Sequence, residues 1–552
     1  MRPHPLFWIL LVALVLRLTG LGFGAHHPDE HLIINHALAF GTGDLNPHMF
    51  YLPTFFMYLL FGLFGFFYAA GHLTGFFLNP DDFLALFLRQ PEIFYVLART
   101  LSGFFGVATV GGIYLLGKEF RNKAVGMWAA LFLAVNFLHV RDSHFATMDI
   151  ALTFFVTLSL YYSLRSLNRG DTAGHWKAIA AAAAAAATKY NGILLAMPIA
   201  MAYLASRPRL RVLARDFFLS AVFFMGIFFC LSPFVLIDFK TTREYIGKLY
   251  ELNRAFQVPW YRHLVMLWHS LGPAFTVLAL AGFIRQFARR SFKDVVLSVF
   301  AVLYYGMITK AGQPFERYVL VLIPIGLLWA ADAAETFALR SGGSSGKRLA
   351  LGILLLLLVL PKTLHQDALF LRRDTRDLTR EWLARNVAPD EKIILDDPGE
   401  APRLTPSPDL VREQILFLDP QNPGSTAKKK RLEVLLRLSP YPAEHYRLYF
   451  LASGTQRPQF TMLTRSVPYD LPALKSLGAG YLVVSDVSLK RAHPEFYEKM
   501  KPYLKEVFRA DPRSDTGKEL SPTSWTYTPI NSEVWNLKRP GPLLYVFKIN
   551  FS

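Results

Sequence analysis

Residues 6–31 read LFWILLVALVLRLTGLGFGAHHPDEH, an apolar run followed by an acidic pair. A helix needs about 20 mostly apolar residues to cross a bilayer, and the stretch 6–24 is long enough. Arg17 interrupts the run and no convincing cleavage site follows it, so we predict a retained membrane anchor and not a cleaved signal peptide. Asp29 and Glu30 are therefore expected directly at the membrane surface.

Similar apolar runs recur through the first two thirds of the chain. The 552 residues are 53% hydrophobic and only 18% charged, whereas an ordinary soluble domain carries about 25% charged residues. This composition excludes a soluble cytosolic enzyme, and the single Cys230 excludes an intrachain disulfide. We predict a polytopic α-helical membrane protein with about eleven spans. Their approximate positions are 6–24, 93–117, 124–140, 149–165, 178–188, 191–205, 217–237, 264–284, 295–309, 318–337 and 349–364.

The formal net charge is +18, and many of the Lys and Arg residues sit in short clusters between these runs. Lys and Arg concentrate in the cytoplasmic loops of multi-pass proteins, so the pattern indicates a membrane protein and not a nucleic-acid-binding one. It predicts a cytoplasmic N-terminus and an extracytoplasmic C-terminus, and the short basic N-terminus favours a bacterial inner (plasma) membrane. The basic loops are 118–123, 165–177, 206–216, 285–293 and 340–348.

A further apolar segment at 50–78 is long enough to span the membrane. If it crossed, the alternation of basic loops would be reversed from residue 93 onward. We therefore expect it to be re-entrant or to lie on the membrane surface, inside a large first outer loop at 25–92 that belongs to a transmembrane domain of residues 1–365.

Residues 366–552 are predicted to form an extracytoplasmic α/β domain. The stretch 374–386 has the apolar spacing of an amphipathic helix, and short strand-like runs follow it. The basic run 428–431 is expected to be a solvated face, with contact to anionic lipid headgroups as the alternative. The predicted strands are Lys392–Leu395, Tyr481–Ser485 and Leu543–Ile549.

The first candidate constellation is HHPDEH at 26–31. Pro28 suits the first turn of a helix, so Asp29 and Glu30 would lie at a helix N-terminus on the bilayer edge. The alternative is an acidic pair that only stabilises the helix dipole. His27, Glu30 and His31 also match the H-x-x-E-H pattern of a zinc protease class, but Pro28 places His27 at the helix boundary and no third ligand is evident.

Further ionisable residues are predicted at the outer ends of other spans. Asp149 begins an apolar helix, where a charge is costly and suggests function, although an N-cap role is the alternative. By the same topology Lys189, Lys310 and Arg317 lie at the outer edge. Cations at that edge can hold a lipid-linked phosphate, with interfacial snorkelling as the alternative for each one singly.

The order of four motifs resembles the GT-C superfamily of lipid-linked sugar glycosyltransferases, in particular the protein O-mannosyltransferase-like and aminoarabinose-transferase-like enzymes. The resemblance covers about residues 1–340 and predicts a GT-C fold. The first motif is the Arg-containing span with its acidic pair and YLPTFFMYLL at 51–60. The others are HFATMDIALTFF at 144–155, TKYNGILLAMP at 188–198 and FERYVLVLIPIGLLWAA at 315–331.

The resemblance implies a role for each candidate residue. Asp29 would be the catalytic base with Glu30 beside it, and Asp149 would position the acceptor or the base. Lys189 and Arg317, joined by Lys310, would hold the donor phosphate. Arg141, His144 and Tyr190 are candidate substrate contacts. His26 and His27 differ from the residues usual before the family's acidic pair, which leaves their roles open.

The predicted function is that of an integral membrane inverting glycosyltransferase, which moves a sugar from a polyprenyl-phosphate-linked donor to a lipid, glycan or protein acceptor at the outer face. One carboxylate serves as general base, and cations stabilise the leaving phosphate. No cofactor is required by the sequence, although some relatives bind a divalent metal whose ligands cannot be assigned here. The alternatives are a transporter or flippase, for which no internal repeat is found, and a membrane scaffold for partner proteins.

Overall fold

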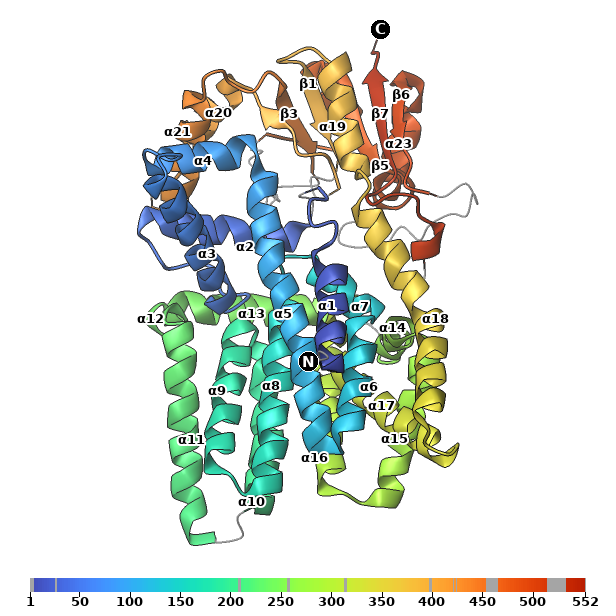
Figure 1. Cartoon of the computed structure of the whole chain (residues 1–552). Coiled ribbons are helices and arrows are strands. Elements are labelled where there is room, and N and C mark those ends of the chain that lie inside the picture. Colours follow the sequence, from blue (N-terminus) through green and yellow to red (C-terminus); the bar gives the residue numbers. More distant parts are fainter. Residues whose placement is uncertain are drawn as a thin grey trace. The chain divides into compact units, whose positions relative to one another are not determined.

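Every predicted membrane segment forms helix in the computed structural model (Figure 1), because long apolar runs with few helix breakers satisfy their backbone groups internally. Each predicted span and its helix agree in approximate position and in being helical. The corresponding helices are α1 (Pro5–Leu18), α5 (Pro91–Phe120), α6 (Lys123–Ala134) with α7 (Phe137–Ser143), α8 (Met148–Arg169), α9 (Thr172–Thr188), α10 (Ala196–Ser206), α11 (Leu210–Leu231), α14 (Arg262–Leu271) with α15 (Pro273–Arg289), α16 (Phe292–Ile308), α17 (Ile323–Arg340) and α18 (Ser345–Phe370).

The chain forms two units, which are described separately. The membrane unit comprises Met1–Thr19, Leu45–Leu60 and Ala98–Asp367, and the α/β unit comprises Gly20–Asp44, Phe61–Leu97 and Ala368–Ser552. Most of the first outer loop thus groups with the C-terminal region. The structure describes residues 4–24, 27–206, 210–255, 259–311, 315–396, 400–419, 421–422, 424–452, 465–513 and 533–551.

Length and composition identify six helices in the described ranges that can cross a membrane, or up to eight if each bent pair is one span. α3 (Phe55–Leu73) is among the six. Several other predicted spans are shorter helices, such as the 14 residues of α1. The predicted helical architecture is therefore confirmed, while the total of eleven spans stays a prediction.

The predicted single span at 264–284 is wrong in shape. α14 and α15 meet at an angle of 111°. Gly272 adopts φ +79° between them, a conformation that favours glycine, and Pro273 begins the second helix. The Gly–Pro pair therefore ends one helix and starts another within what reads as one apolar run.

A second break separates α6 from α7 by 59° at Val135–Asn136. A helix end leaves carbonyls without intrahelical partners, and the fully buried Arg17 of α1 supplies donors for them. Its guanidinium donates to the carbonyls of Leu133 at 2.9 Å and Ala134 at 3.0 Å. The Arg that interrupts the first apolar run therefore closes the broken end of another helix.

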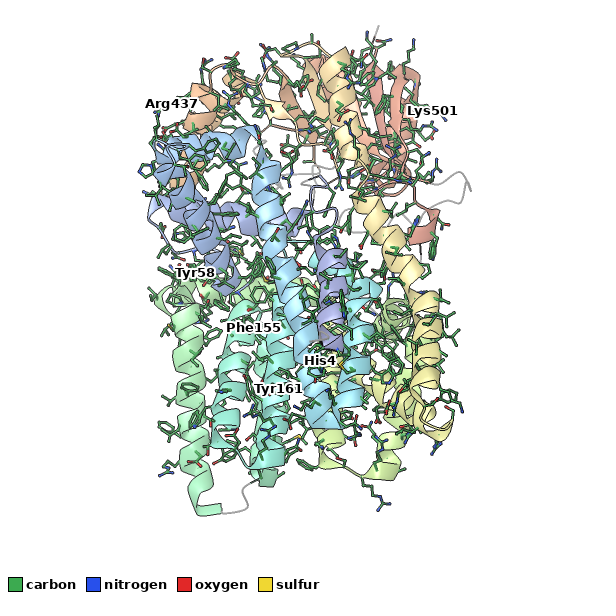
Figure 2. All side chains as sticks on the ribbon, viewed as in Figure 1. His4, Tyr58, Phe155, Tyr161, Arg437 and Lys501 are labelled. Carbon is green, nitrogen blue, oxygen red and sulfur yellow. The ribbon has the colours of Figure 1, made fainter. Side chains whose placement is uncertain are left out.

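The start of α3 is anchored inside the membrane unit. The backbone amide of Thr54 donates to the Ser232 hydroxyl at 3.0 Å, and the Phe55 ring lies 5.8 Å from that of Phe155, which Figure 2 labels on α8. Ser232 directly follows α11. This segment therefore begins beside the ends of helices that the topology assigns to the outer edge.

The end of α3 packs within the α/β unit. Phe67 contacts the rings of Phe83 on α4 (Pro80–Arg89) and Phe94 on α5, at centroid distances of 5.8 and 6.0 Å. Asp81 of α4 pairs with Lys430 at 2.7 Å. These contacts connect the end of the 50–78 segment to the predicted extracytoplasmic domain, and whether it crosses the membrane stays a prediction.

In its described residues, the C-terminal region contains a mixed seven-stranded sheet with the strand order β2-β3-β1-β5-β7-β6, and β4 pairs with β3. Ile393 and Val483 pack on one face and Ile394 and Leu482 on the other, as expected for parallel strands buried on both sides. The predicted α/β fold is confirmed. The strands are β1 (Lys392–Leu395), β2 (Thr405–Pro406), β3 (His445–Leu451), β4 (Ser466–Val467), β5 (Tyr481–Ser485), β6 (Leu504–Ala510) and β7 (Leu544–Ile549).

The predicted amphipathic helix is α19 (Thr375–Asn386), which Asp374 caps and which packs on β6 and β7 (Figure 1). The basic run 428–431 differs from expectation: it lies on α21 (Ser425–Arg437), where Lys430 and Arg431 contact the first outer loop and are not fully solvated. The other helices are α2 (Pro28–Ala39), α12 (Phe234–Ile237), α13 (Phe239–Ala255), α20 (Pro408–Leu416), α22 (Leu471–Leu477) and α23 (Pro494–Met500).

Replacing Arg17 by Met should destabilise the membrane unit strongly. The variant leaves the carbonyls of Leu133 and Ala134 without these donors, and each buried acceptor left unsatisfied costs about 1–3 kcal/mol. Thermal unfolding of the purified protein in detergent measures the effect. Lys118→Met, which removes an exposed cation from α5, is the control and should unfold near the wild-type temperature; equal unfolding of Arg17→Met and wild type would contradict this role.

Thiol labelling tests the path of the 50–78 segment. In a Cys230→Ser background, Thr74→Cys at the exposed end of α3 should react with a membrane-impermeant maleimide in intact cells, because the segment is expected not to cross. Arg385→Cys on α19 and Lys118→Cys in the last turn of α5 provide the outer and inner references. Labelling of Thr74→Cys only after permeabilisation would show that the segment spans the membrane.

Candidate functional site

Asp149 is the carboxylate around which the membrane-unit site is built. It lies in the first turn of α8 and is 4% exposed. Thr147 occupies the N-cap position without a side-chain cap bond, so Asp149 is not the N-cap residue of this helix. A carboxylate here is favoured by the helix dipole, but its burial among apolar helices requires a charged or hydrogen-bonding partner.

Lys189 supplies one partner. It leaves α9 in an extended conformation, and its Nζ donates to Asp149 Oδ1 at 2.8 Å. The close packing that permits this contact comes from small residues: Ser159 of α8 donates to the carbonyl of Ala178 in α9. In the turn after Lys189, a Cβ on Gly192 would lie 2.3 Å from the Ala186 nitrogen, so this return of the chain requires glycine.

Arg317 is the second cation. It lies in the 3-10 segment Glu316–Leu322 that precedes α17, and its Nε is 3.9 Å from Asp149 Oδ2. Its guanidinium stacks 4.1 Å above the Phe315 ring, and Lys189 Nζ is 5.2 Å from the Tyr318 ring. Three separate helix ends therefore bring two cations to one carboxylate, an arrangement with an excess positive charge that suits an anion.

The other predicted residues of this unit occupy different places. The Tyr190 hydroxyl donates to the carbonyl of Phe50 at 3.2 Å, and buried Arg141 pairs with Asp142 at 2.9 Å and Glu316 at 2.5 Å. These contacts fix the backbone that carries the cations. Lys310 is exposed at the end of α16, and within the described ranges its side chain joins none of these pairs.

His144 is completely buried and does not face an open site. Its Nδ1 and Nε2 each lie 2.9 Å from a carbonyl oxygen, of Val140 and Thr19 respectively. Both ring nitrogens therefore contact backbone that joins α7 to the end of the first span. Its described contacts are structural.

Asp29 and Glu30 belong to the α/β unit and lie in the first turn of α2. The N-cap acceptor is the ring of His27, whose Nδ1 accepts from the Asp29 amide at 3.2 Å. Glu30 is fully buried and Asp29 is partly exposed. The His27 side chain thus caps this helix, and the two acids lie in its first turn, where the helix dipole also favours them.

A zinc-protease site is not supported by the described part of the chain. It contains no group of three His, Cys, Asp or Glu side chains that could hold a metal. His27 Nδ1 acts as a cap acceptor and His31 Nδ1 lies 3.3 Å from the Tyr95 hydroxyl. His26, whose role the sequence left open, lies outside the described residues.

Sequence reasoning missed two residues beside Arg317. Glu316 holds Arg141, and the Tyr318 ring lies beside both Lys189 and Arg317. The sequence feature that could have indicated them is FERY at 315–318, where an acid, a base and an aromatic residue follow one another directly before an apolar run. The sequence analysis also did not select Asp367 of α18 as a candidate, although an acid near the end of an apolar run suggests function.

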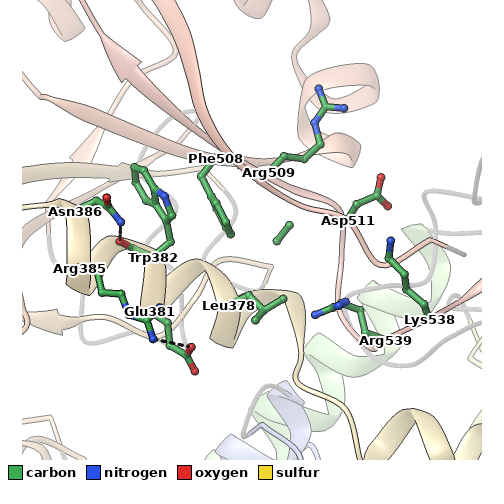
Figure 3. Close-up of a pocket in the computed structure, with 11 residues that line it drawn as sticks. Leu378, Glu381, Trp382, Arg385, Asn386, Phe508, Arg509, Asp511, Lys538 and Arg539 are labelled. Atoms are coloured by element: carbon green, nitrogen blue, oxygen red, sulfur yellow. Dashed lines mark hydrogen bonds and ion pairs between the residues drawn. The ribbon is translucent and has the colours of Figure 1, made fainter. Parts of the chain in front are cut away.

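The α/β unit has an open cavity of about 430 Å³ beside α19 (Figure 3). Trp382 and Phe508 stack at one side with their rings 5.4 Å apart. Arg385, Arg509, Lys538 and Arg539 outnumber Glu381 and Asp511 around it. An aromatic surface with polar and cationic groups suits a polar ligand better than a lipid chain.

Known proteins share this fold. Residues 94–237 match the family described as dolichyl-phosphate-mannose-protein mannosyltransferase. The apo structure of ArnT from Cupriavidus metallidurans is 14% identical, with a TM-score of 0.52 over 98% of this chain and 97% of that one. The chain has the GT-C fold. The resemblance found in the sequence is therefore confirmed.

A second solved structure agrees. The Archaeoglobus fulgidus oligosaccharyltransferase in complex with Zn and sulfate is 14% identical and has a TM-score of 0.50, over 93% of this chain and 72% of that one. ArnT bound to undecaprenyl phosphate is 13% identical, with a TM-score of 0.49 over 98% and 96% of the two chains. No curated protein sequence matches significantly. The structures with TM-scores of 0.50 and 0.52 show the fold, and the family match covers residues 94–237.

Proposed function

We propose that the protein is an inverting glycosyltransferase that takes a sugar from a polyprenyl-phosphate-linked donor at the outer face of the membrane. The observation that carries the proposal is the convergence of Lys189 and Arg317 on buried Asp149. Two cations held at the ends of apolar helices suit a phosphate whose lipid tail lies in the bilayer. ArnT, whose fold this chain shares, is known with undecaprenyl phosphate bound.

In this reaction the acceptor oxygen or nitrogen attacks the anomeric carbon of the sugar. The bond from that carbon to the phosphate oxygen breaks, and the polyprenyl phosphate leaves with the electron pair. Asp29 removes the acceptor proton as general base, with Glu30 beside it. Lys189 and Arg317 stabilise the charge that develops on the phosphate, so no general acid is needed. A single displacement inverts the anomeric configuration.

Asp149 has a positioning role in this proposal. A buried carboxylate that pairs with both cations holds them ready in the absence of donor, because neither long side chain can otherwise stay ordered at low cost. Bound phosphate competes for the same donors. Lys310 would add positive charge at the membrane edge, and Tyr190 and Arg141 would act through the backbone segments that they fix.

The acceptor, which is a lipid, a glycan or a protein, is proposed to contact the α/β domain beside Trp382 and Phe508. No metal ligands are assigned to the reaction. The proposal locates this reaction in a bacterial inner membrane, with the C-terminal domain outside the cytoplasm. The breaks at α6–α7 and α14–α15 are a feature that transporters also use, so a lipid-linked-substrate flippase is the competing function.

Asp29→Asn should abolish sugar transfer. The amide cannot accept the acceptor proton, and loss of a general base lowers the rate by about 10²–10⁴-fold. The measurement is release of polyprenyl phosphate from a panel of radiolabelled polyprenyl-phosphate sugars by purified protein. Asp44→Asn, which changes an exposed acid in the same outer loop, is the matched control. Full activity of Asp29→Asn would refute the assignment, and lipid translocation in proteoliposomes without sugar transfer would favour the flippase.

Lys189→Met should weaken binding of polyprenyl phosphate. Removing one charge-assisted contact to the phosphate costs about 1.5–3 kcal/mol, or roughly 10- to 150-fold in affinity. Binding of a fluorescent polyprenyl phosphate to purified protein measures the change. Lys240→Met on α13 removes an exposed cation elsewhere and should bind as wild type does; unchanged affinity in Lys189→Met would exclude this cation from the donor site.

A further inference from the structure

Helix α2, which carries Asp29 and Glu30, contacts the C-terminal domain through Asn35. The Asn35 Nδ2 donates to the carbonyl of His31 at 2.6 Å, and its Oδ1 accepts from the Arg431 guanidinium at 2.7 Å. All of these residues belong to the α/β unit. A charged donor on α21 therefore reaches the backbone of α2 through one amide side chain.

A second connection runs through Tyr95. Arg403, which precedes β2, donates to the Tyr95 hydroxyl at 2.7 Å, and that oxygen lies 3.3 Å from His31 Nδ1. An arginine only donates, so the Tyr95 hydroxyl accepts from Arg403 and also shares a hydrogen bond with the His31 ring. Arg403 thus holds the Tyr95 hydroxyl in place beside His31 of α2.

Arg431 is held in a fixed geometry. Its guanidinium lies 5.1 Å from the centre of the Phe87 ring of α4, and desolvation lowers its pKa to about 10, so it stays charged at neutral pH. Its neighbour Lys430 pairs with Asp81 at 2.7 Å. The α21 helix therefore contacts α2 and α4 together, which makes the Arg431–Asn35 contact part of a larger surface.

We propose that Arg431 and Arg403 are positioning residues, through which the C-terminal α/β domain holds α2 and its acids in the orientation that transfer requires. This inference rests on the proposed role of Asp29. His31 is two residues and Asn35 six residues from Asp29, so a bond to either restrains the helical turn that carries the base. The domain thereby sets the rate of the reaction in addition to any contact with the acceptor.

Hydrogen–deuterium exchange of α2 tests the connection without any assay of activity. Arg431→Met keeps an apolar side chain against Phe87 but removes the donor to Asn35, and Tyr95→Phe removes only one hydroxyl. Each should raise amide exchange in 32–39 by about tenfold. Arg431→Lys keeps a cationic donor and should restore part of the protection. Lys429→Met, an exposed residue of the same helix, should match wild type.

Sugar-transfer kinetics on the same variants test the catalytic consequence. Arg431→Met and Tyr95→Phe should lower kcat about tenfold with the donor KM within about twofold, because the base is misplaced while the phosphate site is unchanged. Arg431→Lys should recover part of kcat. A residue that merely stabilises the fold would lower the amount of active protein without this split and without rescue.

Each result decides the proposal. Unchanged exchange in both Arg431→Met and Tyr95→Phe would overturn the contacts, and faster exchange with unchanged kcat would overturn the positioning role. Faster exchange, lower kcat and partial rescue by Arg431→Lys would support it. If the wild-type protein transferred no sugar from any donor, the proposed function would fail, and the exchange data would still decide whether the two arginines hold α2.

Discussion

Charged groups inside an apolar helix bundle must find partners, and in the membrane unit these partners come from helix breaks. Asp149 is paired by Lys189, where α9 ends, and by Arg317, just before α17 begins. Arg17 likewise pairs with carbonyls freed where α6 ends. Each break supplies what a regular helix cannot, namely backbone or side-chain groups directed sideways into the bundle. The same requirement that stabilises the bundle therefore concentrates reactive groups at its helix ends.

The sequence predicted the membrane helices well because apolar length is a local property that no tertiary contact has to specify. It predicted the strands at 392–395 and 481–485 for a similar reason, since short β-branched and aromatic runs between turns resolve locally. The sequence did not predict the bends, although Gly272–Pro273 is a possible helix break. A Gly–Pro pair can end a helix or be accommodated within one apolar run, and the sequence alone does not distinguish the two. The sequence did not predict what Arg17 contacts, since its carbonyl partners lie 116 and 117 residues away.

The residues of the candidate site likewise fall into those that the sequence predicted and those that it did not. That Asp149, Lys189 and Arg317 converge followed from motif order and membrane side, and the structure brings these three together. Glu316 and Tyr318 were not anticipated, because their importance comes from Arg141 and Lys189 and not from their own surroundings in the chain. The basic run 428–431 was interpreted as a solvated face because charge runs usually are, whereas Asn35 and Asp81 accept from two of its members.

The two halves of the proposed chemistry belong to different units. The cations for the phosphate lie in the membrane unit, whereas the acids of α2 lie with the C-terminal domain. A carboxylate on an isolated outer loop would sample many orientations, and a general base that is misplaced by about 1 Å loses much of its effect. Contacts from Arg431 and Tyr95 to α2 reduce that freedom within its own unit. In that proposal the α/β domain contributes to catalysis by holding the base, in addition to any contact with the acceptor.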